Sequence, residues 1–205
     1  MVWRCVELCE RAGATVLIIV LSPLLLGVAL MTVALSGRSP LIAHRRVGWN
    51  GSELWLLKFR TMWDRRESFD VRNLAWAEYI DDSAGPDLKG PCDPRVSSHF
   101  ARLCRRHSVD ELPQLLQVAS GKMSLVGPRP VTRRELEFIY GAEAGEIVCH
   151  KPGMAGLWQI SGRNRLTALE RRVLDLKLVR TRSVRLYLEI LIRTVPEVLT
   201  GTNSW

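Results

Sequence analysis

The sequence predicts a mainly α-helical fold of the α+β class, with one small β-hairpin and with its N-terminal helix in a membrane. The first observation is that residues 14–36 contain no charged side chain. Second, Asn50-Gly51 supplies a turn between two segments of β character. Third, several later segments carry apolar residues at helical spacing, which predicts amphipathic helices on the surface of a compact domain. A chain of 205 residues, 47% of them hydrophobic, is long enough to bury one such core.

The uncharged segment 14–36 is long enough to cross a bilayer as a helix, which takes about 20 residues. Pro23 lies inside it, lacks the N–H that would bond the carbonyl of Ile19, and crowds that carbonyl with its ring. The hydroxyl of Ser22 can bond a carbonyl freed in this way. We therefore expect a bend at Ser22-Pro23. A kinked helix that spans the membrane and a re-entrant helix that enters and leaves by one face both fit this pattern.

Basic residues gather directly after the apolar segment. From Arg38 to Arg66 the sequence holds seven Lys or Arg against two acids, and the whole chain has a net charge of +8. A basic segment beside a hydrophobic helix favours contact with anionic membrane lipids and a cytoplasmic position. The charge also suits phosphate-bearing ligands, whereas no recognised motif supports a nucleic-acid partner. The five cysteines form no disulfide framework and no zinc pattern, which is typical of a reducing compartment.

The remaining elements follow in order along the chain. Residues 39–62 predict the β-hairpin, residues 71–80 a helix, and the Gly- and Pro-rich stretch after them a loop. Residues 97–106 are amphipathic and basic, which predicts a helix on the membrane surface. Residues 167–179 and 184–199 predict the last two helices, and Pro196 is expected to bend or end the second of them.

Asp110 and Glu111 form the candidate chemical centre. They stand at the start of a predicted helix over residues 108–119, where Ser108 and Glu111 have the spacing of a capping box. On their own, acids at a helix start only complement the helix dipole. Cations surround this pair in the sequence, namely Arg102, Arg105, Arg106 and the proline-framed Arg129. Because two carboxylates among arginines can bind a divalent cation, and one can attack phosphorus, we predict a centre that acts on a phosphate-bearing substrate.

Lys58 and Arg60 form another cationic cluster. They are two residues apart, so on a strand their side chains share one face. One interpretation is a structural salt-bridge role, and the other is contact with a phosphate. Together with the acid pair and the arginines around it, this cluster suits a diphosphate substrate.

Five stretches of the sequence resemble one family. They are Gly48–Met62, Asp93–Arg95, Ser108–Gln114, Met123–Pro130 and Lys151–Asn164, and they follow one another over almost the whole chain. With these motifs the chain resembles the bacterial sugar transferases, which are monotopic polyprenyl-phosphate phosphoglycosyl transferases. The stretch Gly156–Asn164 and the long insert between Met62 and Asp93 look most like the hexose-1-phosphate branch of that family.

The resemblance implies a reaction. A sugar 1-phosphate would pass from a UDP-sugar, with galactose or glucose as the sugar, to a polyprenyl (undecaprenyl) phosphate, as the first membrane step of polysaccharide or glycoconjugate assembly. Asp110 would carry a covalent phosphosugar, and Glu111 would bind Mg²⁺. By position, Lys58, Arg60, Arg95 and Arg129 would contact phosphate or brace the site, and Gln159 would help to shape the sugar-nucleotide pocket.

The resemblance also implies a location. Residues 1–38 would form a re-entrant membrane helix broken at Ser22-Pro23, and residues 39–205 a catalytic domain on the cytoplasmic face of the bacterial inner membrane. The chain resembles a minimal catalytic core of the family, and a homodimer is left open. A membrane-anchored scaffold with the same fold and no activity is the alternative.

Several positions depart from the family pattern. Cys9-Glu10 stands where Phe-Asp is usual, and Leu178 and Tyr187 stand where Tyr and Asp are expected. His44 and Ala155 replace a usual Gln and Thr. None of these touches Asp110 or Glu111, so the resemblance implies intact catalysis, while the departures near the C-terminus concern substrate preference and packing.

Overall fold

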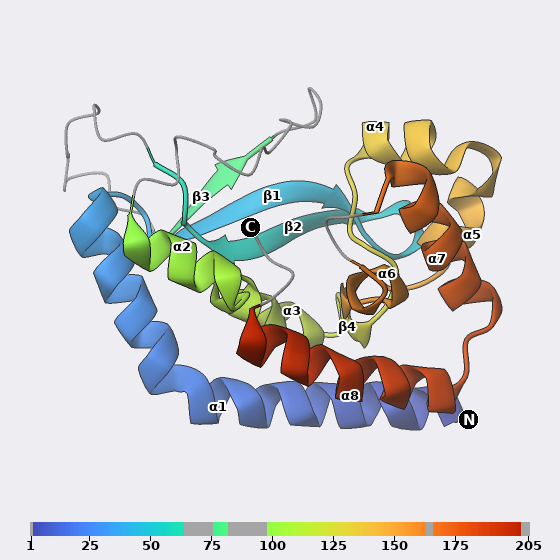
Figure 1. Cartoon of the computed structure of the whole chain (residues 1–205), viewed down its shortest axis with the longest axis horizontal. Helices are drawn as coiled ribbons and strands as arrows, with labels where there is room; N and C mark the ends of the chain where they lie inside the picture. Colours follow the sequence, from blue (N-terminus) through green and yellow to red (C-terminus); the bar gives the residue numbers. More distant parts are fainter. Residues whose placement is uncertain (1, 64–75, 82–97, 163–165, 202–205) are drawn as a thin grey trace.

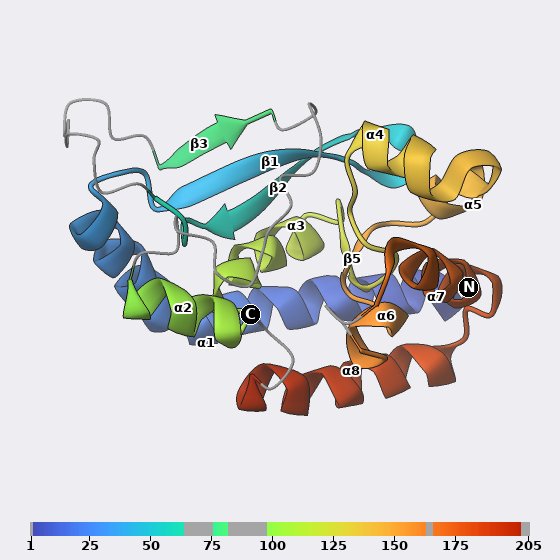
Figure 2. The same ribbon diagram turned by 45° about the horizontal axis from the view of Figure 1, so that its top comes forward.

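The computed structural model describes residues 2–63, 76–81, 98–162 and 166–201. One long helix, α1 (Val2–Ser36), runs along one side of the molecule, and a three-stranded sheet lies on the other side (Figure 1). At the end where α1 begins, Figures 1 and 2 show a group of short helices together with α7 (Ala168–Arg180). At the other end, α2 (His99–Arg106) lies beside the second half of α1 (Figure 1). The predicted mixture of many helices and little sheet is confirmed.

Helix α1 is continuous through Pro23 and bends in its middle (Figure 1). The hydroxyl of Ser22 donates a hydrogen bond of 2.7 Å to the carbonyl of Ile19, which is the carbonyl that Pro23 leaves without a donor. The sequence therefore predicts the bend and this bond, but the backbone stays helical where a break was expected. The helix is long and apolar enough to cross a membrane by length and composition. Whether it spans or re-enters stays a prediction, as does the division at residue 38.

The first turns of α1 pack on the rest of the protein. The side chain of Glu10 is buried, and its Oε1 accepts hydrogen bonds from Ser124 Oγ at 2.5 Å, Leu125 N at 2.7 Å and the Tyr187 hydroxyl at 2.5 Å. Further along, the buried Ala14 belongs to a hydrophobic core with residues from α3 (Leu115–Ala119). The start of α1 is therefore fixed against the domain by both polar and apolar contacts.

The predicted β-hairpin is confirmed. Strand β1 (Leu41–Val47) pairs antiparallel with β2 (Glu53–Phe59), and the turn between them contains η1 (Trp49–Gly51). Asn50 has a φ of 53°, the left-handed conformation that this residue type tolerates better than most. The hairpin presents Lys58 near the end of β2.

The helix predicted over residues 71–80 is wrong for its described part, because Ala77–Ile80 forms strand β3. This strand pairs parallel with β1, and the Tyr79 ring meets Trp55 edge-on with ring centroids 5.1 Å apart. Pairing with a free strand edge thus overrides the local pattern. Residues 71–75 lie outside the described residues.

The segment after α2 carries the acid pair, and it is not one capped α-helix. A 3-10 helix, η3 (Val109–Gln114), leads into α3. Ser108 has a φ of 53° and makes no side-chain cap, and only its carbonyl bonds the Glu111 N–H, at 3.1 Å. The predicted capping box is therefore wrong. Pro113 has no N–H for a hydrogen bond within the helix, and the segment forms the tighter 3-10 turn. The Glu111 side chain accepts a hydrogen bond from Lys58 rather than from the Ser108 N–H.

A two-stranded parallel sheet, β4 (Ser124–Val126) with β5 (Gly153–Ala155), lies in the middle of the molecule. Its strands approach so closely that a Cβ on Gly153 would lie 2.0 Å from the Gly127 nitrogen. Around it pack α6 (Leu157–Ile160), α7 and α8 (Val184–Thr200). Helices α7 and α8 confirm the predictions, with a Thr167–Glu170 capping box on α7, and α8 continues past Pro196.

The segment between β4 and β5 folds into short helical turns. They are α4 (Arg133–Glu135), the π-helix η4 (Leu136–Tyr140), the 3-10 helix η5 (Gly141–Glu143) and α5 (Ala144–Val148). These turns pack against α7. The π-helix matters for the site described below, because it ends at the buried Tyr140.

Candidate active site

The acid pair lies where η3 packs against β2 and α2. Lys58, projecting from β2, forms an ion pair with Glu111 in which Nζ lies 2.6 Å from Oε1. Both side chains are partly buried. The hairpin and η3 are far apart in sequence, so tertiary packing brings this lysine to the predicted chemical centre.

Asp110 is a strongly perturbed carboxyl. Burial and the neighbouring charge of Glu111 raise the pKa of Asp110 to about 6, while the charges of Lys58 and Arg105 act to lower it. A carboxyl with this pKa is mostly ionised at pH 7 and is poorly solvated, which suits a nucleophile. Burial and the charge of Asp110 also raise the pKa of Cys104 to about 11, so this thiol is neutral and does not compete as a nucleophile.

The acids present fit a magnesium ion that is held partly by the substrate. The described residues contain no group of three or more His, Cys, Asp and Glu side chains that could enclose a metal ion. Mg²⁺ is usually bound through one or two carboxylates, with substrate phosphates and water completing its shell. Asp110 and Glu111 supply that number of carboxylates. The predicted Mg²⁺ thus suits this donor set when a phosphate substrate is present.

Arg60 is placed away from the acid pair. Its buried guanidinium donates to the carbonyl of Ser39 at 2.9 Å and to Glu78 at 2.5 Å. It joins the end of α1 to the hairpin and to β3, which matches the salt-bridge interpretation rather than contact with a phosphate. Arg95 lies outside the described residues.

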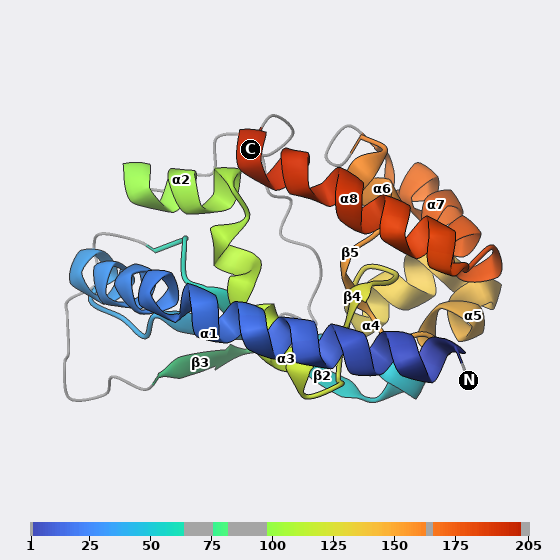
Figure 3. The same ribbon diagram turned by 90° about the horizontal axis from the view of Figure 1, so that it is seen from below.

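Arg129 and Gln159 belong to a second cluster, around Trp158 of α6. The guanidinium carbon of Arg129 lies 5.0 Å from the centroid of the Trp158 ring, and that of Arg171 lies 5.1 Å from it. Gln159 donates to the Met154 carbonyl at 2.9 Å. In Figures 1 and 3 the β4–β5 sheet lies between α3, next to the acid pair, and the helices α6 and α7. Arg105 and Lys58 therefore accompany the acids, whereas Arg129 contacts Trp158 and Gln159 contacts Met154.

Sequence reasoning did not single out Arg171, Asp175, Tyr140 or Glu10. Arg171 and Asp175 are four residues apart on a helix, a spacing that puts both on one face, but nothing in the sequence says what that face meets. Glu10 enters the sequence analysis only as part of a departure from the family pattern, with no role assigned, although its side chain is buried. A buried acid inside an otherwise apolar contact is visible only in the folded structure.

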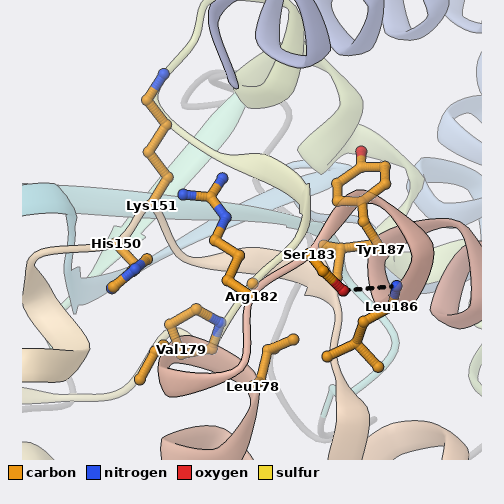
Figure 4. A pocket seen from close by; sticks show the side chains of 11 residues that line it. His150, Lys151, Leu178, Val179, Arg182, Ser183, Leu186 and Tyr187 are labelled. Atoms are coloured by element: carbon orange, nitrogen blue, oxygen red, sulfur yellow. Dashed lines mark hydrogen bonds between the residues drawn. The ribbon is translucent and has the colours of Figure 1, made fainter. Parts of the chain in front are cut away.

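A small pocket opens between the end of β4 and the turn that joins α7 to α8 (Figure 4). Lys151, Arg182 and Tyr187 reach toward one side of it in Figure 4. These three side chains are held by α1. Lys151 pairs with Glu7 at 3.2 Å, Arg182 stacks on Trp3 at 3.7 Å, and Tyr187 bonds Glu10. The lining of this pocket thus secures α1, and it contains neither acid of the candidate centre.

Comparisons with known proteins agree with the motifs. A family model described as bacterial sugar transferase matches residues 2–201. The chain is 39% identical over 198 residues to the exopolysaccharide production protein ExoY of Rhizobium meliloti, covering 94% of this chain and 84% of that protein. It is 34% identical over 204 residues to the UDP-glucose:undecaprenyl-phosphate glucose-1-phosphate transferase of Caulobacter vibrioides, covering 96% and 70%. It is also 38% identical over 148 residues to the undecaprenyl-phosphate galactose phosphotransferase of Salmonella typhimurium, covering 72% and 30%. The chain belongs to the bacterial sugar transferase family, within its hexose-1-phosphate transferase branch.

Proposed function

We propose that this protein transfers a hexose 1-phosphate from a UDP-hexose to undecaprenyl phosphate, with Asp110 as the nucleophile. The observation that carries the proposal is the ionised, poorly solvated Asp110 beside Glu111, with Lys58 and Arg105 close enough to shift the pKa of Asp110. The printed activities of the relatives, a glucose-1-phosphate transferase and a galactose phosphotransferase, support the same class of reaction.

The proposed chemistry has two displacements at one phosphorus atom. A carboxylate oxygen of Asp110 attacks the phosphorus that carries the hexose, the bond from that phosphorus to the bridging oxygen breaks, and UMP leaves. An oxygen of undecaprenyl phosphate then attacks the same phosphorus, and the bond to Asp110 breaks. The products are UMP and the lipid diphosphate hexose, and the carboxylate is restored. A carboxylate nucleophile thereby divides one transfer into two easier steps.

The residues around Asp110 have separate roles in this proposal. Lys58 and Arg105 offset negative charge as the diphosphate approaches, and they keep Asp110 ionised. Glu111 would hold Mg²⁺ together with the diphosphate, and the bound ion would neutralise charge on the leaving UMP. Because Glu111 is paired with Lys58, the arrival of the metal requires Lys58 to turn toward the phosphate oxygens.

We further propose that the protein acts at the cytoplasmic face of the inner membrane, with α1 as a re-entrant helix. Apolar side chains of α1 such as Ile19, Val20 and Leu30 are exposed. Helix α8 adds an exposed apolar stripe at helical spacing, formed by Val184, Leu188, Ile192, Val195 and Leu199. Both helices lie on the side of the molecule seen in Figure 3. These exposed apolar side chains on both helices support attachment to a bilayer, which is where an undecaprenyl phosphate resides.

The test follows UMP release and the covalent intermediate together. Membrane-embedded protein receives UDP-glucose or UDP-galactose, Mg²⁺ and undecaprenyl phosphate, and the Asp110→Asn variant is compared with wild type. We expect turnover with one of these sugars, a loss of about 10³-fold or more in Asp110→Asn, and a phosphohexose adduct on Asp110 by intact-protein mass when the lipid is omitted. Asp81→Asn, which removes an exposed carboxylate paired with Arg45, serves as the matched control.

Two outcomes contradict the proposal. If wild type releases no UMP with any UDP-sugar of a wider panel but still binds lipid vesicles, the non-catalytic scaffold is the better account. If Asp110→Asn keeps full activity, Asp110 is not the nucleophile.

A further inference from the structure

Unpaired polar atoms gather around Trp158. Within the described part of the chain, four buried side-chain atoms there have no hydrogen-bond partner: Trp158 Nε1, Gln159 Oε1, Arg171 Nε and Asp175 Oδ1. Leaving a buried polar group unpaired costs about 1–3 kcal/mol, and native proteins contain few such groups. Their concentration in one place, with donors and acceptors together, points to a ligand that completes them.

Two arginines share the ring at this place. Arg129 is exposed, and its guanidinium has no hydrogen bond or ion pair among the described residues beyond its stacking on Trp158. Arg171 stacks on the same ring. Burial and the charge of Arg129 lower the pKa of Arg171, which shows that the two cations lie close together. Two neighbouring guanidinium groups repel each other, and an anion between them removes that cost.

The charges of both arginines act on Asp175. Its side chain is 1% exposed, and its Oδ2 accepts a hydrogen bond of 2.7 Å from the hydroxyl of Tyr140, which is 2% exposed. The π-helix η4 ends at Tyr140, and such turns often occur at functional sites. The groups that act on Asp175 come from three elements: the hydroxyl of Tyr140 from η4, the charge and the backbone N–H of Arg129 from the loop after β4, and the charge of Arg171 from its own helix α7. The charge of Glu135 of α4 also acts on Arg171.

We propose that Arg129 and Arg171 form a two-arginine clasp for a phosphate group of a substrate, and that Asp175, held by Tyr140, is the positioning residue that sets this clasp. The inference rests on the proposed function for the identity of the substrates. A guanidinium pair binds a phosphate through several parallel N–H donors, which needs both planes held in fixed directions. The buried carboxylate of Asp175 acts on both guanidinium groups and so can fix their directions, and both groups contact the Trp158 ring.

The molecule contains a matched control for Tyr140. Tyr187 also donates its hydroxyl to a buried carboxylate, Glu10, at 2.5 Å. That carboxylate fixes α1 and lies outside the clasp. Tyr140→Phe and Tyr187→Phe therefore remove the same kind of bond at two places, and only the first should affect binding of a phosphate ligand.

The experiment measures KM and kcat for both substrates, UDP-hexose and undecaprenyl phosphate, and titrates UMP calorimetrically. Arg171→Lys keeps the positive charge but loses the paired N–H donors of the guanidinium group. In this variant and in Tyr140→Phe, we expect the KM for one of the two substrates to rise about tenfold while kcat changes less than twofold. A rise for UDP-hexose with weaker UMP binding assigns the clasp to the nucleotide sugar. A rise for undecaprenyl phosphate alone assigns it to the lipid. Tyr187→Phe should leave both KM values and UMP binding unchanged.

A pH profile adds a readout that a packing defect would not move. The ionised carboxylate of Asp175 positions the two arginines, and its protonation removes that interaction. The affected KM should therefore rise as the pH falls through about 6 in wild type. Without the Tyr140 hydroxyl, which lowers the pKa of Asp175, the same rise should begin at higher pH. If both variants leave the KM values and UMP affinity unchanged, the clasp is wrong. Absence of turnover in wild type would instead overturn the proposed function, and the UMP titration would still test the clasp.

Discussion

Lys58 Nζ lies 2.6 Å from Glu111 Oε1, so the residue expected to bind a metal ion already carries a cation of the protein itself. The charge of Lys58 offsets part of the repulsion between the two adjacent acids. The ion pair also holds β2 against η3, which is the packing that positions Asp110. An incoming diphosphate with Mg²⁺ can exchange partners with this ion pair, because it offers anionic oxygens to Lys58 and a cation to Glu111.

The first prediction concerns this lysine and the pH profile. The nucleophile must be ionised, so kcat/KM of wild type should fall about tenfold per pH unit below pH 6. Lys58→Met removes a charge that lowers the pKa of Asp110, so the acid limb should move to higher pH and activity at pH 7 should drop about 10–100-fold. UMP release between pH 5 and 9 measures both effects. Lys122→Met, at an exposed lysine, should leave the profile in place. An unmoved limb in Lys58→Met would contradict this account.

A second prediction is that Asp110→Asn makes the folded protein more stable while it removes activity. The pKa of Asp110 is raised in the folded protein from 3.8 to about 6, so the folded state holds its proton to higher pH than the unfolded chain. Ionisation of this group therefore weakens the folded state as the pH rises from about 4 to about 6, and above that window the loss stays constant. Asp110→Asn should unfold a few degrees higher at pH 7.5, a gain of about 1–2 kcal/mol after solvent screening, while it abolishes turnover. Thermal unfolding should show that the stability gained by Asp110→Asn shrinks as the pH falls toward 4. If the variant is less stable than wild type at pH 7.5, the ionised Asp110 does not destabilise the folded protein.

Local patterns predicted much of this fold. The hairpin follows from Asn50-Gly51, helices α7 and α8 from apolar residues at helical spacing, and the bend of α1 from Pro23. The acid pair could be found from residue types and family motifs. These features depend on neighbours in the sequence, and sequence reasoning is strongest there.

The relation between the clusters could not be predicted. Lys58 and Arg60 would share a face only within one strand, but β2 ends at Phe59 and the chain then turns Arg60 toward Glu78. Strands β4 and β5 are three residues each, too short for a sequence pattern that would predict them. The meeting of Tyr140 with Asp175 depends on a π-helix, which has no local sequence signal.

A third prediction concerns the attachment of α1. Glu10 accepts three hydrogen bonds through one oxygen, and its removal leaves the Ser124 hydroxyl, the Leu125 N–H and the Tyr187 hydroxyl buried without an acceptor. Glu10→Ala should therefore destabilise the protein by about 2–4 kcal/mol. Glu7→Ala removes a more exposed ion pair with Lys151 and should cost under about 1 kcal/mol. Denaturant unfolding in nanodiscs compares the two, and equal losses would show that Glu10 is not the anchor.

The fourth prediction concerns the path of α1 through the bilayer, and two cysteines test it. Cys5 lies near the start of α1, and Cys149 follows α5 in the domain; both are exposed. A re-entrant helix keeps both on the cytoplasmic side, whereas a spanning helix puts Cys5 outside and leaves Cys149 inside. In single-cysteine variants, we expect a membrane-impermeant maleimide to label neither residue in spheroplasts and both after permeabilisation. Because Cys149 reports on leakage, labelling of Cys5 alone in intact spheroplasts would establish a spanning helix. The bend at Pro23 would then be a kink within the membrane, with its freed carbonyl still satisfied by Ser22.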